Sequence, residues 1–210
     1  MARTSSLKGD RLENRLATAL SVWLSRHLQE DYRPHFRNEP SSGANAANAT
    51  RRAPLPGYGA ITPASIGVAD VHPLTPEAHE LLNTVAFECK NYSTLEWGRL
   101  IFTPDSLTST NTIKFQHEHH RKLCAHYRVI PIMVYNETQI KSGEPVLLIP
   151  VPVSRRLMKA VPGVEEAYLA TFKSVKSDVL RMTTVLHTCP YSDFINVFTT
   201  YKDEFYANDL

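Results

Sequence analysis

The most regular pattern in this chain is an amphipathic helix near its N-terminus, expected over residues 8–29. Leucines recur at every fourth position and a tryptophan falls on the same side, which predicts one apolar face that packs on a core. The residues of this face are Leu12, Leu16, Leu20, Trp23, Leu24 and Leu28.

Glu13 interrupts this apolar face. In helical projection it falls between Leu20 and Leu24, so its carboxylate points toward the core. Burying a carboxylate is costly unless a charged group meets it. A second interpretation is a capping box, in which Asp10 starts the helix and Glu13 reaches back to a backbone N–H. The sequence alone leaves both interpretations open.

Residues 84–92, TVAFECKNY, predict a strand with two unlike faces. One face is apolar, and the other carries an acid and a lysine near the end of the strand. Such a pair can be a solvated contact worth about a few tenths of a kcal/mol on an edge strand. The two faces hold Val85, Phe87 and Cys89 on one side, and Ala86, Glu88, Lys90 and Tyr92 on the other.

The other expected elements follow from periodicity and turn residues. A short strand over residues 65–71 would bring Asp70 next to Glu88 at one edge, and a helical turn is expected after Pro76. The remaining expected elements are strands at 34–37, 128–135, 144–153 and 181–188, and helices at 112–127, 164–180 and 192–206.

The helix expected over 112–127 contains the run His-Glu-His-His. Its apolar face is predicted to hold Phe115, Leu123 and Tyr127, with Gln116 among them. His117, Arg121 and Lys122 would lie on the opposite side, facing solvent or phosphate. The histidines scatter around the helix without a ligand-spaced partner, so a zinc site is not expected.

Residues 37–67 are rich in Ser, Gly, Ala, Asn and Pro and predict a long loop. Loops of this length are often functional or disordered. The doublet Arg51-Arg52 suits a clamp that orders on a polyanion, although the segment could equally be a dispensable insertion.

Composition sets broad limits on the class of protein. The net charge of +2 over 210 residues means that a nucleic-acid surface would have to be local. No apolar stretch is long enough to span a membrane, and the N-terminus lacks the apolar region of a secretory signal. Three widely spaced cysteines predict no disulfide framework, so a reducing cytoplasm is expected.

Four polar placements now stand in one order: Glu13 on the first helix, Asp70 on a strand, Glu88 and Lys90 on the next strand, and Gln116 on the following helix. With the segments KGDRLENRL, EPSSG, GVADV, AFECK and FQHEHHRKLCAHYRVIPIMVY, this order resembles the PD-(D/E)XK nuclease superfamily. Within it, the chain is most similar to the archaeal-type Holliday-junction resolvases, over roughly residues 8–150.

The resemblance implies that Asp70 and Glu88 bind a divalent metal, normally Mg²⁺ with Mn²⁺ as a substitute. It implies that Lys90 positions or activates the attacking water and stabilises charge on the phosphate. Glu13 matches the helix acid that completes the metal shell, and Gln116 matches the helical glutamine that orders the site. The residues expected to contact DNA are Ser41 or Ser42, matching a family serine near the scissile phosphate, together with Arg51, Arg52, Lys114 and Arg121.

This set of residues is what the chemistry needs. Phosphodiester hydrolysis requires hydroxide near neutral pH and neutralisation of a dianionic transition state. Hard carboxylate oxygens hold Mg²⁺ with several waters left on it, and the metal acidifies water and bridges phosphate oxygens. A lysine two residues beyond a carboxylate ligand keeps its ammonium on the same side of the strand.

The chain departs from the family pattern in several places. Ala69 stands where the family has proline, the segments on either side of Asp70 are longer, and the region after 150 has no counterpart. The expected organisation is a restriction-endonuclease-like α/β core over 1–150, with a mixed sheet flanked by helices, and an α+β extension over 151–210. That extension could dimerise, bind DNA or wrap the core.

The expected function is metal-dependent cleavage of DNA, most simply of branched DNA by a homodimer. One apolar side of the C-terminal helix, with Phe194, Phe198, Tyr201 and Phe205, is a candidate interface, or else packs on its own core. The alternatives are a restriction or repair nuclease acting on linear duplex, and a DNA-binding scaffold without catalysis.

Overall fold

In the computed structural model of the chain, helix α1 (Arg3–Leu28) buries the apolar face that its leucine spacing predicts. Five residues of that face are each at most 3 % exposed: Leu12, Leu16, Leu20, Trp23 and Leu24. The helix begins at Arg3, so Asp10 lies inside it and not at its start. A capping box needs Asp10 at the N-cap, and the capping interpretation of Glu13 is therefore wrong.

The structure describes residues 3–38, 70–92, 113–137 and 144–207. Besides α1, its α-helices are α3 (Pro76–Leu82), α5 (Ile113–Tyr127), α6 (Val151–Ala160), α7 (Met182–Thr188) and α8 (Tyr191–Ala207), and its 3₁₀ turns are η4 (Val164–Ala167) and η5 (Lys173–Val175). Its strands are β1 (Phe36–Asn38), β2 (Val71–Pro73), β3 (Val85–Tyr92), β4 (Ile130–Glu137), β5 (Val146–Pro150), β6 (Tyr168–Phe172) and β7 (Ser177–Arg181).

Five of the described strands form one mixed sheet in the order β3-β4-β5-β7-β6. β3 and β4 are parallel and are joined through α5, whereas the other neighbours are antiparallel. β1 and β2 form a separate antiparallel pair beside β3. The expectation of a mixed sheet flanked by helices is thus confirmed.

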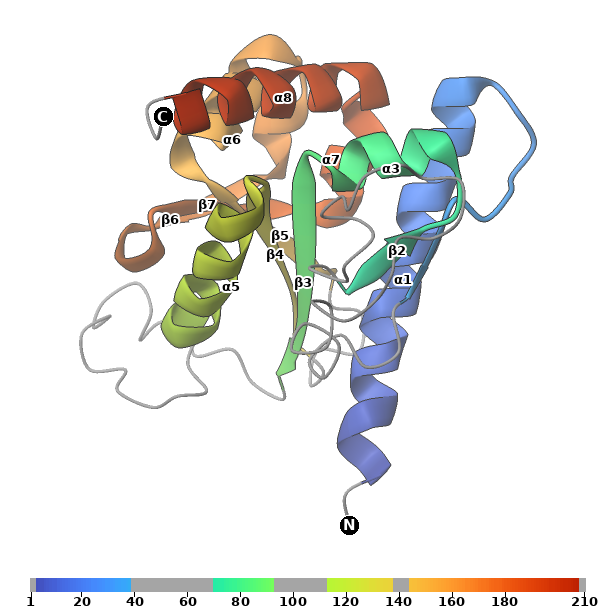
Figure 1. The fold of residues 1–210 in the computed structure, drawn as a ribbon, viewed down its shortest axis with the longest axis horizontal. Coiled ribbons are helices and arrows are strands. Elements are labelled where there is room, and N and C mark those ends of the chain that lie inside the picture. Colours follow the sequence, from blue (N-terminus) through green and yellow to red (C-terminus); the bar gives the residue numbers. More distant parts are fainter. Residues whose placement is uncertain (1–2, 39–69, 93–112, 138–143, 208–210) are drawn as a thin grey trace.

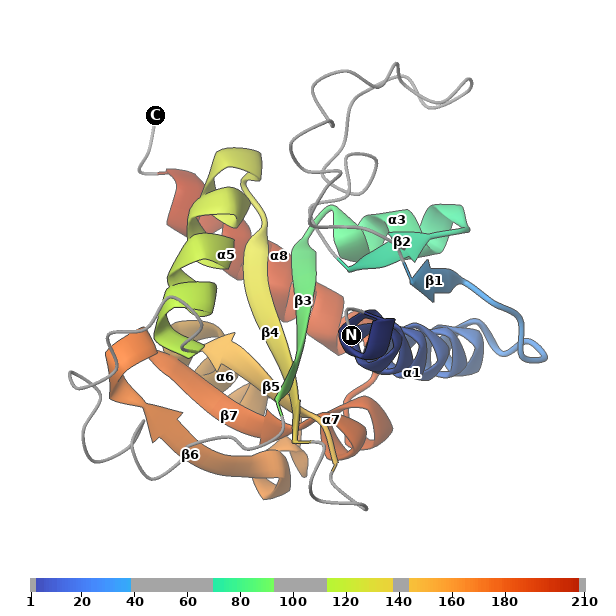
Figure 2. The ribbon, with the colours of Figure 1, turned by 90° about the horizontal axis from the view of Figure 1, so that it is seen from below.

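Helices cover both faces of this sheet (Figure 1). Figure 2 shows α1 and α5 on opposite sides of the β3–β4 pair. Val85, Phe87 and Cys89 of β3 belong to the large core that α1, α6, α7 and α8 share. Ala86 packs instead with Cys124 of α5. The alternation predicted for β3 is therefore confirmed, and Glu88 and Lys90 lie on its α5 side.

The sheet and its core continue across residue 150. β5 pairs along its whole length with β7, so the 151–210 segment supplies two strands of the same sheet. Phe194 and Phe198 of α8 lie in one hydrophobic core with Leu16 of α1. The segment expected as an extension thus completes the sheet and buries the N-terminal helix.

Two expected elements in this half of the chain are wrong, and a third ends earlier than expected. The strand expected over 144–153 is confirmed as β5 but ends at Pro150, because Pro152 fixes a helical φ in the first turn of α6. The helix expected over 164–180 is instead the turns η4 and η5 and the strands β6 and β7, whose apolar residues recur at near-helical intervals. Residues expected as a strand over 181–188 form α7.

The apolar side of α8 does not form a free interface. Phe194 and Phe198 are at most 1 % exposed and stack on each other within the protein's own core. Of the four residues predicted on this side, Phe205 is the one with a largely exposed ring, at 49 %. For Phe194 and Phe198 the alternative of packing on the protein's own core is therefore confirmed, because the helix uses that side to cover the sheet.

Candidate active site

Asp70 lies directly before β2 and is bound to β3 through two hydrogen bonds. Its backbone N–H donates to the Phe87 carbonyl at 2.9 Å, and its Oδ2 accepts from the Cys89 N–H at 2.6 Å. The residue is 3 % exposed. Because these bonds fall on the two neighbours of Glu88, Asp70 is held beside the Glu88 position, at the edge of the five-stranded sheet.

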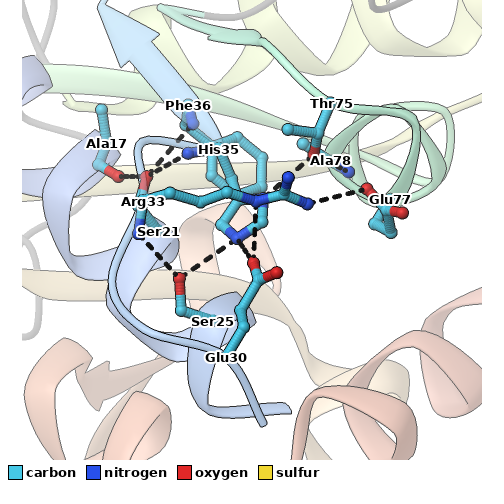
Figure 3. Close-up of polar contacts among 10 residues, drawn as sticks. All are labelled: Ala17, Ser21, Ser25, Glu30, Arg33, His35, Phe36, Thr75, Glu77 and Ala78. Atoms are coloured by element: carbon cyan, nitrogen blue, oxygen red, sulfur yellow. Dashed lines mark hydrogen bonds and ion pairs between the residues drawn. The ribbon is translucent and has the colours of Figure 1, made fainter. Parts of the chain in front are cut away.

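A buried polar network fixes the short strand pair that carries Asp70 (Figure 3). Ser21 of α1 accepts hydrogen bonds from the backbone N–H groups of His35 and Phe36, both at 3.1 Å, and donates to the Ala17 carbonyl at 2.8 Å. These bonds attach β1 to α1. Since β1 pairs with β2, the position of Asp70 depends on this attachment.

His35 is the centre of the same network and is fully buried. Its Nδ1 lies 3.0 Å from Thr75 Oγ1, and its Nε2 lies 2.8 Å from Glu30 Oε1 and 3.1 Å from Ser25 Oγ. Because the Glu30 carboxylate only accepts, Nε2 carries a proton toward it. Thr75 is also the N-cap of α3, so one histidine ties α1, β1 and α3 together (Figure 3).

Glu88 and Lys90 form an ion pair on the α5 side of β3. The Lys90 ammonium donates to Glu88 Oε1, and the side chains are 26 % and 23 % exposed. Their partial exposure leaves them within reach of solvent and of a ligand. A partly exposed pair of this kind contributes at most about 1 kcal/mol to stability.

Cys89 is a buried thiol between Glu88 and Lys90 along β3, and its side chain packs in the large core on the opposite face of the strand. Burial raises the pKa of its thiol well above the ordinary value, and the charges of Asp70, Glu13 and Glu88 raise it further, while Lys90 lowers it. The thiol is therefore protonated at neutral pH.

His120 of α5 is a site neighbour that the sequence reasoning missed. It is 2 % exposed, and its Nε2 lies 3.0 Å from the Ala86 carbonyl, which can only accept. Nδ1 lies 4.0 Å from Glu88 Oε2. Burial lowers the pKa of His120 to about 4, so the ring is neutral at pH 7 with its proton on Nε2. The ring thereby packs α5 against the strand that carries Glu88.

The predicted face of α5 is confirmed for Leu123 and Tyr127, which pack against the core, and is wrong for Phe115 and His117. Phe115 is 45 % exposed, whereas His117 and His120 are buried and form one stripe with Ile113 and Cys124. The spacing of these four residues is helical, and it could have been found if histidine and cysteine had been counted as buried positions. Partnered histidines are tolerated in cores.

The remaining predicted residues are not gathered at Asp70. Gln116 is half-buried on the flank of the α5 stripe, and its side chain has no hydrogen-bond partner among the described residues. Lys114 is half-buried and Arg121 is exposed on the same helix. The predictions for Ser41, Ser42, Arg51 and Arg52 lie outside the described residues.

The donor chemistry of this cluster fits a hard divalent cation. Asp70 and Glu88 supply carboxylate oxygens, and Mg²⁺ is commonly bound by one or two carboxylates with waters completing its shell. Within the described parts of the chain, no group of three histidine, cysteine or acidic side chains is arranged to hold an ion. An ion bound here would be coordinated by few protein ligands and would keep several waters.

Comparison with protein-family models, curated proteins and solved structures found no match to this chain. Among the helices that the structure describes, none has the length and apolar character needed to cross a membrane. The case for a function therefore depends on Asp70, Glu88 and Lys90 at the edge strand β3.

Proposed function

We propose that this protein is a metal-dependent DNA endonuclease of the PD-(D/E)XK type. The observation that carries the proposal is that Asp70 is hydrogen-bonded to both neighbours of Glu88, so that Asp70, Glu88 and Lys90 lie together at the edge strand β3. Carboxylate oxygens are the ligands that Mg²⁺ prefers, and a lysine ammonium beside them can offset charge on a phosphate. A cluster of this composition therefore points to a site for a cation and a phosphate.

Asp70 and Glu88 would hold the ion, and Glu13 would complete its surroundings from α1. When bound, Mg²⁺ supplies an acidified water and neutralises charge on the phosphate. Lys90, which bonds Glu88 Oε1, would hold the water and offset charge on the phosphate oxygens. The thiol of Cys89, with its raised pKa, stays protonated and does not compete as a soft ligand.

We propose DNA as the substrate and branched DNA as its preferred form. Lys114 and Arg121 supply positive charge on α5, the helix that also carries His120 next to Glu88. One acid–lysine set per chain makes one nick, so resolving a four-way junction would need two copies of the chain. Because α8 covers its own core, those copies would meet through another surface.

The deciding experiment is a cleavage assay on a four-way junction and on a linear duplex of matched sequence, with Mg²⁺ or with EDTA. We expect nicks in the junction with Mg²⁺ and none with EDTA. Equal cleavage of both DNAs would support the nuclease assignment and contradict the preference for branched DNA. Metal-dependent binding without cleavage would identify a DNA-binding scaffold. The absence of both binding and cleavage would overturn the proposal.

We predict that Glu13 acts in this site and does not stabilise the helix terminus. Glu13→Gln keeps the shape of the side chain but removes its charge, so Mg²⁺-dependent cleavage should fall by about 10- to 100-fold. The melting temperature should stay nearly unchanged. Glu166→Gln, at an exposed carboxylate of η4, is the matched control. Unchanged cleavage by Glu13→Gln over a full Mg²⁺ titration would contradict this role.

A further inference from the structure

A pocket lies on the flank of α5 that faces α8. Its volume is about 470 Å³, and it is lined by parts of α5, α8, η5 and the sheet ends at Ile130 and Pro150. Glu13, Asp70, Glu88 and Lys90 are not among its lining residues. The volume falls within the usual range for a small-molecule site. The carboxylates and the lysine of the proposed nuclease site therefore lie outside this pocket, whereas Arg121, proposed above to attract DNA, lines it.

His117 gives the pocket wall one defined hydrogen-bond acceptor. The residue is 4 % exposed and lines the pocket, with Nε2 3.0 Å from Ser177 Oγ. The Ser177 hydroxyl donates its hydrogen to the Val175 carbonyl at 3.2 Å, so it accepts from His117 Nε2–H. Nδ1 keeps its lone pair and has no hydrogen-bond partner among the described residues. Burial lowers the pKa of His117 to about 4, which keeps this acceptor unprotonated at pH 7.

Phe205 gives the same pocket an aromatic surface. Its ring stacks on Tyr201, with centroids 5.5 Å apart, yet 49 % of the residue remains exposed. A large exposed apolar side chain beside a concave, apolar wall marks a ligand surface more often than an isolated one does. A planar ring covers the face of an aromatic side chain such as Phe205 best.

The rim of the pocket is positively charged. Arg121 and Lys176 are both exposed there, and Glu118 is the one acid on the rim. Lys176 has a φ of 50°, a left-handed conformation that is unusual for lysine, and its carbonyl accepts from the Val151 N–H at 3.0 Å. This backbone bond fixes the lysine where the chain turns into β7, beside the pocket.

We propose that this pocket binds a nucleotide, meaning a planar nitrogenous ring that carries a phosphate. The ring stacks on Phe205, a ring N–H donates to His117 Nδ1, and the phosphate pairs with Arg121 and Lys176. The ligand is either a free mononucleotide or the terminal nucleotide of a strand, since both present the same chemistry. The proposal does not depend on nuclease activity.

Isothermal titration calorimetry in EDTA tests the proposal, because chelation removes metal-dependent binding at Asp70 and Glu88. The probes are AMP, adenosine, ribose 5-phosphate and a 5′-phosphorylated tetranucleotide. We expect AMP to bind with a Kd of about 10–100 µM, and each fragment to bind at least about tenfold more weakly. Tighter binding of the tetranucleotide than of AMP would identify a strand end as the natural ligand.

Variants assign the binding to this pocket. Phe205→Ala should weaken AMP binding by about tenfold through lost stacking, and Arg121→Gln by about fivefold through lost charge pairing. Both residues are largely exposed, so the fold should tolerate these changes. Lys159→Gln, at an exposed lysine of α6, and Asp70→Asn should leave the affinity unchanged. No saturable binding of AMP or the tetranucleotide would overturn the proposal, as would equal affinity in all variants.

Discussion

Asp70→Asn should lower Mg²⁺-dependent cleavage by about 10³-fold, because an ion held by carboxylates contributes several kcal/mol to the transition state. The asparagine side-chain oxygen can still accept from the Cys89 N–H, so the contact between Asp70 and β3 survives. Glu88→Gln should have a similar effect. Binding of the DNA should be retained or become tighter, because each change removes a negative charge near the phosphate.

Steady-state cleavage, fluorescence anisotropy and thermal melting together test this expectation. Asp31→Asn, at an exposed carboxylate after α1, is the control for loss of a charge alone. Cleavage by both Asp70→Asn and Glu88→Gln at the wild-type rate, in saturating Mg²⁺, would show that these carboxylates do not hold the catalytic ion. If Asp70→Asn loses folding together with cleavage, Glu88→Gln remains the informative variant, because Glu88 is partly exposed.

Stability should fall steeply between pH 6.5 and pH 4 because of two buried histidines. Burial lowers the pKa of both His117 and His120 from 6.5 to about 4. Below pH 6.5 the unfolded chain takes up a proton at each histidine while the folded chain does not. The free energy of unfolding therefore falls as the pH falls, by about 3 kcal/mol for each histidine over the whole range. Such a loss is a large share of a typical stability of about 5–15 kcal/mol.

The neighbouring charges and hydrogen bonds do not reverse the lowering of these two pKa values. Next to burial, His120 and Arg121 lower the pKa of His117, and Glu118 opposes them. For His120, the bond to the Ala86 carbonyl and the charge of Asp70 raise the pKa, while Lys90 and His119 lower it. In both residues burial is the largest effect, so the folded state favours the neutral ring.

Urea denaturation at pH 7.5, 6.5, 5.5 and 4.5 in EDTA measures this effect. His117→Gln should reduce the pH dependence by about half, whatever its own stability at pH 7.5. His187→Gln, at an exposed histidine of α7, should leave the dependence unchanged. A free energy of unfolding that stays constant from pH 6.5 to pH 4.5 would show that both rings are protonated in the folded state.

Periodicity predicted the elements whose burial follows a simple pattern. The leucines of α1 and the alternation of β3 gave the correct faces, and the second of these placed Glu88 and Lys90 on the α5 side. The same reasoning failed on α5 because His117 and His120 are polar side chains with buried partners, Ser177 and the Ala86 carbonyl. Periodicity of apolar residues contains no information about such partners.

Other features depend on contacts between distant parts of the chain. The strand β7 lies between β5 and β6, and its central position makes Asp178 a buried residue that bonds Ser154 and Arg155 of α6. The network around His35 joins residues from α1, β1 and α3. Local sequence spacing reports neither arrangement, so the C-terminal strands and the attachment of β1 could not be predicted.

The bond between Trp23 and the Cys189 carbonyl, at 2.8 Å, joins positions 166 residues apart. During synthesis on the ribosome, α1 emerges about 10–30 s before its partner at ordinary elongation rates. Its leucine face packs on β1 and β3, which are made earlier, but the part of α1 around Trp23 stays uncovered until α7 and α8 have been made. Folding that depends on such distant contacts is intrinsically slow. The side of α1 that carries Trp23 is therefore completed last, after residue 189 has been made.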